Sequence, residues 1–256
     1  MALVRCDFFS DVLGFSTSMT VILPQTTTGQ IGMTGRTSGG AFPTLYLLHG
    51  LSDDDTIWLR RTSIERYVAE LGLAVVMPAA HRSFYTDEYY GRPYWTFLTE
   101  ELPQVAGRFF RLSDRRADTF VAGLSMGGYG AFKWALRHPE RFAAAASLSG
   151  ALDVASRLYQ PPNTADPRMW QRILGGQPIA DTPNDLFHLI AQAKEPPPLY
   201  LCCGTDDVVY DDNVRFVEAC RRHGVTLESQ LGPGAHEWGY WDAKIQDVLA
   251  WLPLSG

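Results

Sequence analysis

Gly123-Leu124-Ser125-Met126-Gly127 places a serine between glycines at the end of an apolar run, residues 119–122. The run predicts a buried strand, and the residues after the second glycine predict a helix, so the serine lies in a sharp turn between the two. Glycines suit such a turn, since a side chain at either flanking position would collide with the neighbouring strand or helix. The pattern therefore makes Ser125 a candidate nucleophile.

Glycine-rich turns of this kind also occur without any catalytic role, so the surrounding sequence decides. Apolar and amphipathic runs alternate along the chain, which is typical of an α/β fold with a mostly parallel sheet and helices on both of its faces. The predicted strands are Thr44–Leu48, Leu73–Met77, Thr119–Ala122, Ala143–Leu148, Leu199–Cys203 and Thr226–Leu231. Ser125 therefore follows a central strand of the predicted sheet.

The amphipathic runs predict helices between these strands. One runs from Gly127 to His138, and another begins at a capping box of Thr62 with Glu65 and ends at Gly72. A third is predicted from the apolar face Trp95, Leu98, Leu102, Val105 and Phe109, and the last from Trp241, Ile245, Val248, Leu249 and Leu252. Each face is expected to pack against the core.

Two stretches interrupt the alternation. Residues 26–41 are rich in Thr and Gly without periodicity, and predict a mobile hairpin or loop. Residues 153–198 are rich in proline and weakly periodic, and we expect them to form a small cap insertion over the site. Because no linker divides the chain, residues 1–256 are expected to form a single domain.

Composition narrows the functional classes. The chain has 256 residues, 46% of them hydrophobic, enough for one large core. A net charge of −6 argues against a nucleic-acid partner, because phosphate binding requires a basic surface. No apolar run approaches the ~20 residues of a membrane span, and the N-terminus lacks a basic segment followed by an apolar one. We therefore expect a soluble, unprocessed cytoplasmic protein without a membrane partner.

The cysteines indicate no disulfide framework. Cys6, Cys202, Cys203 and Cys220 are few and unevenly spaced. We expect buried free thiols.

A serine hydroxyl becomes an effective nucleophile when a base removes its proton and an acid orients that base. In this class of fold the acid and then the base follow the serine along the chain, on loops after later strands. Asp206 and Asp207 follow the strand predicted at 199–203, and His236 lies on a glycine-rich loop after the last predicted strand. The other five histidines have simpler structural roles, so His236 is the predicted base.

Acyl transfer also requires donors for the developing oxyanion, and the loss of one donor typically costs about 3–4 kcal/mol. The turn itself supplies the backbone N–H of Met126. We assign the second donor to the backbone N–H of Leu51, because Gly50 lets that loop approach the serine closely. These two residues are the predicted substrate-binding positions.

Asp53, Asp54 and Asp55 could indicate a divalent-cation site. Consecutive acidic residues do not converge on one ion without further ligands, and no zinc-type spacing of histidine and carboxylate lies nearby. We predict no metal site. Asp211 and Asp212 are expected to cap the helix that follows them.

Several segments together carry a family resemblance: Leu47–Leu51, Trp58–Thr62, Glu101–Pro103, Ala122–Ala131, Cys203–Asp207 and Gly234–Trp238. With these segments the sequence resembles the esterase D branch of the α/β-hydrolases, and within it the small tributyrin and acetyl esterases of bacteria. The resemblance spans nearly the whole chain and is least clear over residues 153–198.

The resemblance implies an α/β-hydrolase fold and a serine carboxylesterase that acts on small-molecule esters of short acyl chains, acetyl to butyryl, without a cofactor. The family pattern Cys-Gly-x-x-Asp implies Asp207 as the acid, and Asp206 then faces away. Relatives often self-associate, so a homo-oligomer is possible.

Other activities stay open as alternatives. S-formylglutathione hydrolases of the same branch usually carry a cysteine just beyond the oxyanion loop, where this chain has Ser52 and Asp53. Mycolyltransferases of the antigen 85 type share the fold and triad, but they are exported. A non-catalytic α/β-hydrolase scaffold would lack a member of the triad, whereas all three residue types are present here.

Aromatic residues gather after the strand predicted at 73–77. They are Phe84, Tyr85, Tyr89, Tyr90, Tyr94 and Trp95. They could line an acyl or aryl pocket, stack on a sugar, or form a packed loop. The sequence does not choose between these roles, and the natural substrate stays open with them.

Overall fold

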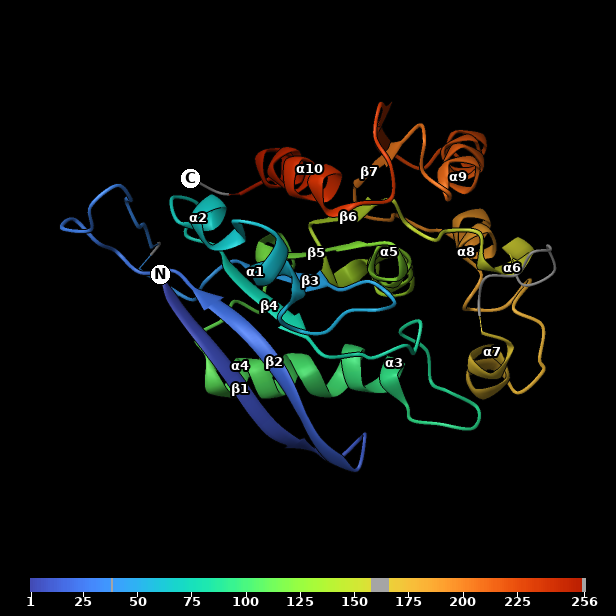
Figure 1. The fold of residues 1–256 in the computed structure, drawn as a ribbon, viewed down its shortest axis with the longest axis horizontal. Coiled ribbons are helices and arrows are strands. Elements are labelled where there is room, and N and C mark those ends of the chain that lie inside the picture. Colours follow the sequence, from blue (N-terminus) through green and yellow to red (C-terminus); the bar gives the residue numbers. More distant parts are fainter. Residues whose placement is uncertain (38, 158–165, 255–256) are drawn as a thin grey trace.

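The computed structural model describes all residues except 38, 158–165 and 255–256. Its strands form one eight-stranded sheet in the order β1-β2-β4-β3-β5-β6-β7-β8 (Figure 1). The strands are β1 (Ala2–Ser10), β2 (Phe15–Leu23), β3 (Thr44–Leu48), β4 (Ala74–Pro78), β5 (Thr119–Leu124), β6 (Ala144–Leu148), β7 (Leu199–Gly204) and β8 (Leu227–Gly232). β3 to β8 run parallel, whereas β1 and β2 are antiparallel to their neighbours. The mostly parallel sheet and all six predicted strands are confirmed, with ends that differ by at most two residues.

The N-terminal hairpin β1–β2 was not predicted. Polar side chains interrupt both strands, with Arg5 and Asp7 in β1 and several Ser and Thr residues in β2, so neither forms a continuous apolar run. The alternation of buried and exposed positions along β1 is the signal that could have revealed it. The hairpin extends the sheet beyond β4.

The helices surround the sheet (Figure 1). They are α1 (Ile57–Arg61), α2 (Ile64–Val68), α3 (Tyr94–Thr96), the π-helical turn η1 (Phe97–Glu101), α4 (Leu102–Phe109), α5 (Met126–Arg137), α6 (Val154–Arg157), α7 (Pro167–Leu174), α8 (Leu186–Gln192), α9 (Tyr210–His223) and α10 (Trp238–Trp251). Short 3-10 turns, η2 (Arg116–Asp118) and η3 (Pro139–Arg141), precede β5 and β6.

Two hydrophobic layers hold these helices to the sheet. Alternate residues of one strand enter different layers: Leu45 and Leu47 pack with α1, α2 and α10, while Tyr46 and Leu48 pack with α4, α5 and α9. The parallel strands are buried on both faces for this reason, which explains their continuous apolar sequences. The prediction of helices on both faces is confirmed.

The predicted capping box is wrong. The backbone N–H of Thr62 donates to Trp58 O and ends α1, so it is not free to bond Glu65. The Thr62 hydroxyl oxygen instead accepts from the N–H of Ile64, at 3.1 Å, where α2 begins. The segment therefore forms two short helices.

The predicted face that ends at Phe109 is also partly wrong. Leu98 and Leu102 are fully buried, but Phe109 is 58% exposed. The π-helical turn η1 adds a residue to one turn, which rotates the following helix relative to a regular pattern. Pro103 has no N–H for Thr99 O, and the Arg141 guanidinium donates to that oxygen instead.

The two irregular stretches differ from each other. Residues 26–41 form a hairpin-like loop, with one antiparallel bridge between Thr27 and Gly35, while residue 38 lies outside the described part. In the stretch 153–198 the structure describes three short helices, α6, α7 and α8, with 158–165 outside the described residues. Asp166 and Asp185 cap α7 and α8 with their side chains.

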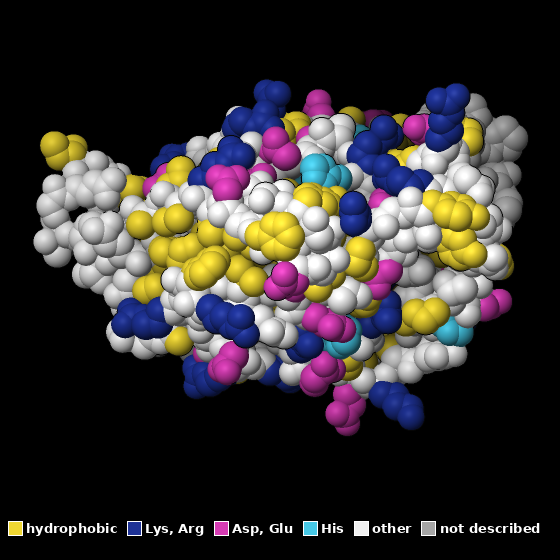
Figure 2. All heavy atoms as spheres, turned by 90° about the horizontal axis from the view of Figure 1, so that it is seen from below, with side chains coloured by type: hydrophobic (Ala, Val, Ile, Leu, Met, Phe, Trp, Pro, Cys, Tyr) yellow, Lys and Arg dark blue, Asp and Glu magenta, His cyan; other side chains and the backbone are white. Residues whose placement is uncertain are grey.

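The molecular surface mixes charge types. Figure 2 shows the face seen from below, where hydrophobic side chains gather on the side of β1, β2 and α4, with basic and acidic side chains around them. Large exposed hydrophobic residues of these elements are Leu3, Phe9 and Phe109. Every helix in the described part of the chain is too short or too polar to cross a membrane.

The four cysteines are free. Three of them are buried as expected, but Cys6 is only partly buried because β1 lies at the edge of the sheet. Burial raises the pKa of the Cys202 thiol to about 12. That thiol is therefore protonated at neutral pH.

Candidate active site

Ser125 lies in a strained turn between β5 and α5. Its φ of 52° and ψ of −116° are rare for a residue with a side chain. A Cβ on Gly123 would lie 2.4 Å from the backbone of Gly127, and one on Gly127 would lie 2.4 Å from Leu48 O. Only glycine fits at these two positions, as the sequence predicted.

The structure brings Ser125, His236 and Asp207 together, although they are far apart in the sequence. His236 Nε2 lies 3.0 Å from Ser125 Oγ, and His236 Nδ1 lies 2.9 Å from Asp207 Oδ1. The second carboxylate oxygen of Asp207 lies 3.0 Å from the same nitrogen. With Nδ1 protonated, Nε2 is an acceptor for the serine hydroxyl. The geometry is that of a nucleophile, base and orienting acid.

Asp207 is buried beneath the histidine, whereas Asp206 is exposed. Burial raises the pKa of the Asp207 carboxyl, but the hydrogen bond from His236 and the N–H of Val209, at 2.9 Å, outweigh it and hold that pKa below its usual value. The carboxylate is therefore ionised and its oxygens are held in place. Consecutive residues here point in opposite directions, as expected.

The loops of acid and base are bonded to each other. Asp206 N–H donates to Gly234 O at 2.9 Å, and Thr205 N–H donates to Gly232 O at 2.8 Å. A Cβ on Gly204 would lie 2.1 Å from Gly234 O, so the two loops touch through their backbones. This contact fixes the distance between Asp207 and His236.

Two N–H groups are available beside the serine. Met126 is the first residue of α5, where backbone N–H groups have no intrahelical acceptor. Leu51 follows Gly50, whose position would put a Cβ 2.7 Å from the Leu124 side chain, so this loop closely approaches the end of β5. Among the described hydrogen bonds, none engages the N–H of Leu51 or Met126.

His49 braces the same loop. Its Nδ1 donates to Gly50 O at 2.7 Å, and its Nε2 accepts from Ala80 N–H at 2.9 Å. Burial lowers the pKa of His49, so the neutral ring that these two bonds require is favoured. The Tyr85 hydroxyl donates to His49 O at 2.9 Å. The sequence suggested that His49 shapes the loop, but it gave no signal for Tyr85.

Sequence reasoning missed Ser149 and underestimated Trp241. Ser149 is buried directly after β6, and its hydroxyl oxygen accepts from Trp241 Nε1 at 3.1 Å. A hydrogen bond from Ser149 also contributes to lowering the pKa of Asp207. Trp241, predicted only as a core residue, lies edge-on to His236 with ring centroids 4.9 Å apart. The position of Ser149 at a strand end was the available signal.

The aromatic segment after β4 is mostly a packed loop. Phe84, Tyr85, Tyr94 and Trp95 are buried, whereas Tyr89 and Tyr90 are exposed. Phe84 packs against Trp170 of α7 with ring centroids 4.5 Å apart. The backbone N–H of Tyr89 and Tyr90 donate to carbonyls at the end of α7. The segment thus joins the stretch 153–198 to the core.

Polar contacts also attach that stretch to α5. Tyr129, one turn after Ser125, donates its hydroxyl to Asn184 O at 2.7 Å. The buried Lys133 donates to Asn184 Oδ1 at 3.2 Å and to the Thr86 hydroxyl at 2.9 Å. The helix that begins at the serine therefore carries residues 184–186 on its flank.

The acidic runs have separate partners. Asp54 accepts from Thr56 and Arg60, and Asp55 accepts from two β2 hydroxyls. Asp211 and Asp212 lie in the first turn of α9, whose N-cap is Val209, so the predicted cap is wrong. Among the residues that the structure describes, no group of three or more His, Cys, Asp or Glu is arranged to hold a metal ion.

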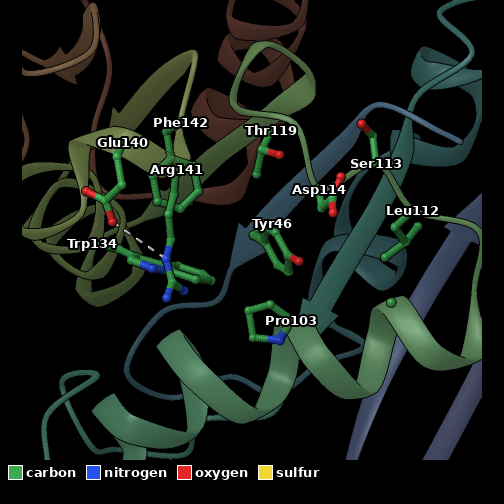
Figure 3. A pocket seen from close by; sticks show the side chains of 11 residues that line it. Tyr46, Pro103, Leu112, Ser113, Asp114, Thr119, Trp134, Glu140, Arg141 and Phe142 are labelled. Atoms are coloured by element: carbon green, nitrogen blue, oxygen red, sulfur yellow. Dashed lines mark ion pairs between the residues drawn. The ribbon is translucent and has the colours of Figure 1, made fainter.

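A cavity of about 250 Å³ lies at the opposite edge of the sheet (Figure 3). Tyr46, Trp134 and Phe142 line it, near the starts of β5 and β6. The candidate triad lies beyond the other ends of these strands. This cavity is therefore separate from the candidate active site.

Comparison with known proteins agrees with this geometry. A family model described as a putative esterase matches residues 10–252. This chain belongs to that esterase family. It is 27% identical to an acetyl esterase of Caldicellulosiruptor saccharolyticus over 98% of both chains. The chain is a carboxylic ester hydrolase of the esterase-D-like group.

Two solved structures resemble the esterase closely. One is FphF, a fluorophosphonate-binding serine hydrolase of Staphylococcus aureus, with 34% identity, a TM-score of 0.86 and 98% of both chains covered. The other is the S-formylglutathione hydrolase FrmB of Staphylococcus aureus, with 35% identity, a TM-score of 0.84 and 98% of both chains covered. The esterase therefore has an α/β-hydrolase fold.

Proposed function

We propose that this esterase hydrolyses short-chain acyl esters, acetyl to butyryl, through an acyl-enzyme on Ser125. The observation that carries this proposal is the hydrogen-bonded chain from Ser125 Oγ through His236 to the buried Asp207. Such a chain lets a neutral imidazole take the serine proton while the carboxylate stabilises the imidazolium that forms. The similarity to an acetyl esterase supports a short acyl group.

The reaction then has two halves. Ser125 Oγ attacks the ester carbonyl as His236 Nε2 takes its proton, and the backbone N–H groups of Leu51 and Met126 stabilise the oxyanion. His236 returns the proton to the leaving alcohol, which leaves an acyl-enzyme. Water, deprotonated by His236, attacks the acyl carbonyl and frees the acid and Ser125. The site needs no cofactor or metal for these steps.

A thioester substrate is the second candidate, and the similarity to FrmB favours it. The chain has Ser52 and Asp53, rather than a cysteine, just beyond the oxyanion loop. Side-by-side kcat/KM values for p-nitrophenyl acetate and S-formylglutathione decide between the two. We expect the oxygen ester to be preferred, and a preference for the thioester would contradict the proposal. Acyl transfer in the manner of antigen 85 would appear as ester formation when an alcohol is added, and a non-catalytic scaffold would hydrolyse nothing.

The acyl-length preference is testable with a series of p-nitrophenyl esters. Each CH₂ that fits a pocket gains up to ~0.8 kcal/mol, but one that meets a wall gains nothing. We expect kcat/KM to be highest between acetyl and butyryl and to fall for octanoyl and longer chains. A maximum at long chains would overturn the short-acyl assignment.

Acid should reduce kcat/KM by a single protonation. His236 must be neutral to accept the serine proton, whereas the lowered pKa of Asp207 keeps that carboxylate ionised. A plot of log kcat/KM against pH should therefore have a limiting acid slope of one. A slope of two would mean that a second group also titrates. By linkage, Asp207 stabilises the fold above the usual aspartate pKa, and this contribution is lost as pH falls through its lower folded value.

Chelation should not affect the enzyme. Because the acidic residues near the site bond to hydroxyl, amide and guanidinium groups, we expect EDTA to leave kcat/KM unchanged. Recovery of activity on adding a divalent ion to EDTA-treated protein would contradict this expectation.

We propose further that residues 1–256 act as one domain in which 153–198 form a cap beside the site. The bonds from Tyr129 and Lys133 to Asn184 support the cap. Four unpaired cysteines support a cytoplasmic location, and the net charge of −6 supports the absence of a nucleic-acid partner. Self-association is the remaining expectation about partners.

A further inference from the structure

β1 forms one edge of the sheet. It bonds to β2 along its whole length, and within the described residues no strand lies on its other side (Figure 1). Its nine residues span about 30 Å at 3.4 Å per residue. An unpaired edge of this length is a template for another strand.

The exposed face of β1 has an ordered pattern. Leu3, Arg5, Asp7 and Phe9 alternate along the strand and all are exposed. Arg5 and Asp7 lie on either side of the strand midpoint, with Arg5 Nε 3.4 Å from Asp7 Oδ2. Leu3 and Phe9, outside them, are each more than half exposed. The sequence of side chains is therefore apolar, positive, negative, apolar.

This pattern is complementary to itself in an antiparallel pairing. When a second copy pairs around Cys6, Arg5 lies opposite Asp7 of the second copy and Leu3 lies opposite its Phe9. Both contacts occur twice, because the arrangement is two-fold symmetric. Opposite charges and apolar pairs directly across antiparallel strands are stabilising.

The charges also select this register. Residues that face each other across a symmetric antiparallel pair lie on the same face, so the register changes in steps of two. One step puts Arg5 opposite Arg5 of the second copy, and a step the other way puts Asp7 opposite its own copy. Only pairing around Cys6 joins opposite charges, and it is also the register that pairs all of Ala2–Ser10.

We propose that β1 is a dimer interface, through which two copies of this chain join their sheets into one continuous antiparallel sheet centred on Cys6. β1 and β2 lie outside β4, whereas the triad loops follow β5, β7 and β8. The interface therefore leaves the candidate active sites free. This inference does not depend on the proposed substrate.

Charge reversal tests the interface and its register together. Arg5→Asp and Asp7→Arg each place like charges opposite one another, and we expect either change to raise the dimer Kd by about tenfold or more. The double variant R5D/D7R restores both opposite-charge pairs and should dimerise as the wild type does. Sedimentation velocity over a concentration series measures each Kd.

Mixing the two single variants gives the sharpest result. A chain with acids at both positions and a chain with arginines at both positions form two opposite-charge pairs, so the mixture should contain a heterodimer that neither variant forms alone. Misfolded variants could not complement each other in this way, and esterase activity with circular dichroism checks the fold of each. Dimers that persist in both single variants, or single variants that fail to combine, would overturn the proposal.

A cross-link tests the two-fold centre. Cys6 is the only cysteine that is not buried, and pairing around it brings the two Cys6 residues opposite each other. A short bismaleimide should convert the wild type to a covalent dimer and leave Cys6→Ser unchanged. The competing role for Arg5 and Asp7 is to discourage strand pairing, and a wild type that stays monomeric and resists cross-linking would establish that role instead.

Discussion

Ser125→Ala should lower kcat by about 10⁴-fold or more and leave the fold intact, because the acyl-enzyme then has no attachment point. The change removes one hydroxyl, whose only described bond is to His236, and keeps the Cβ in the same strained turn. Initial rates with p-nitrophenyl acetate measure the loss. Ser52→Ala, at an exposed serine of the neighbouring loop, is a matched control and should retain nearly full activity. Comparable activity in the two variants would remove Ser125 from the mechanism.

The second large effect distinguishes neighbouring acids. Asp207→Asn should lower kcat on the order of 10⁴-fold, since an amide at that position can favour the wrong tautomer of His236. Asp206→Asn should cost less than about tenfold, because the Asp206 side chain is exposed and its backbone N–H, which bonds Gly234, is unchanged. The two variants differ by one position and by the same chemical change.

The ranking of these variants is the readout. Steady-state kcat of both variants on one substrate is sufficient, with circular dichroism to show that each has folded. If Asp206→Asn has the larger effect, Asp207 does not orient the histidine during catalysis.

The central sheet could be predicted because its strands are buried on both faces. Runs such as Thr44–Leu48 are apolar throughout, and helices with clear end signals separate them. β1 and β2 could not be found this way, because charges and hydroxyls occupy their exposed positions. The π-helical turn before α4 was also hidden, since a regular period accounts for Leu98 and Leu102 but not for the exposure of Phe109.

The site was easier to predict than its supports. Ser125 and His236 lie in glycine-rich turns after strands, where the local sequence reports a constrained backbone. Ser149 and Tyr85 act through contacts with distant segments, and no local pattern encodes such contacts. The helices α6 and α8 are four and seven residues long, too short for their periodicity to stand out.

The most direct test of the account is the site of labelling by a fluorophosphonate. Such a reagent phosphonylates the serine whose proton a neighbouring base removes, so the modified residue identifies the nucleophile. Peptide mapping by mass spectrometry should find one adduct per chain, on Ser125, and none in Ser125→Ala. An adduct on another residue, together with esterase activity that survives in Ser125→Ala, would contradict the account.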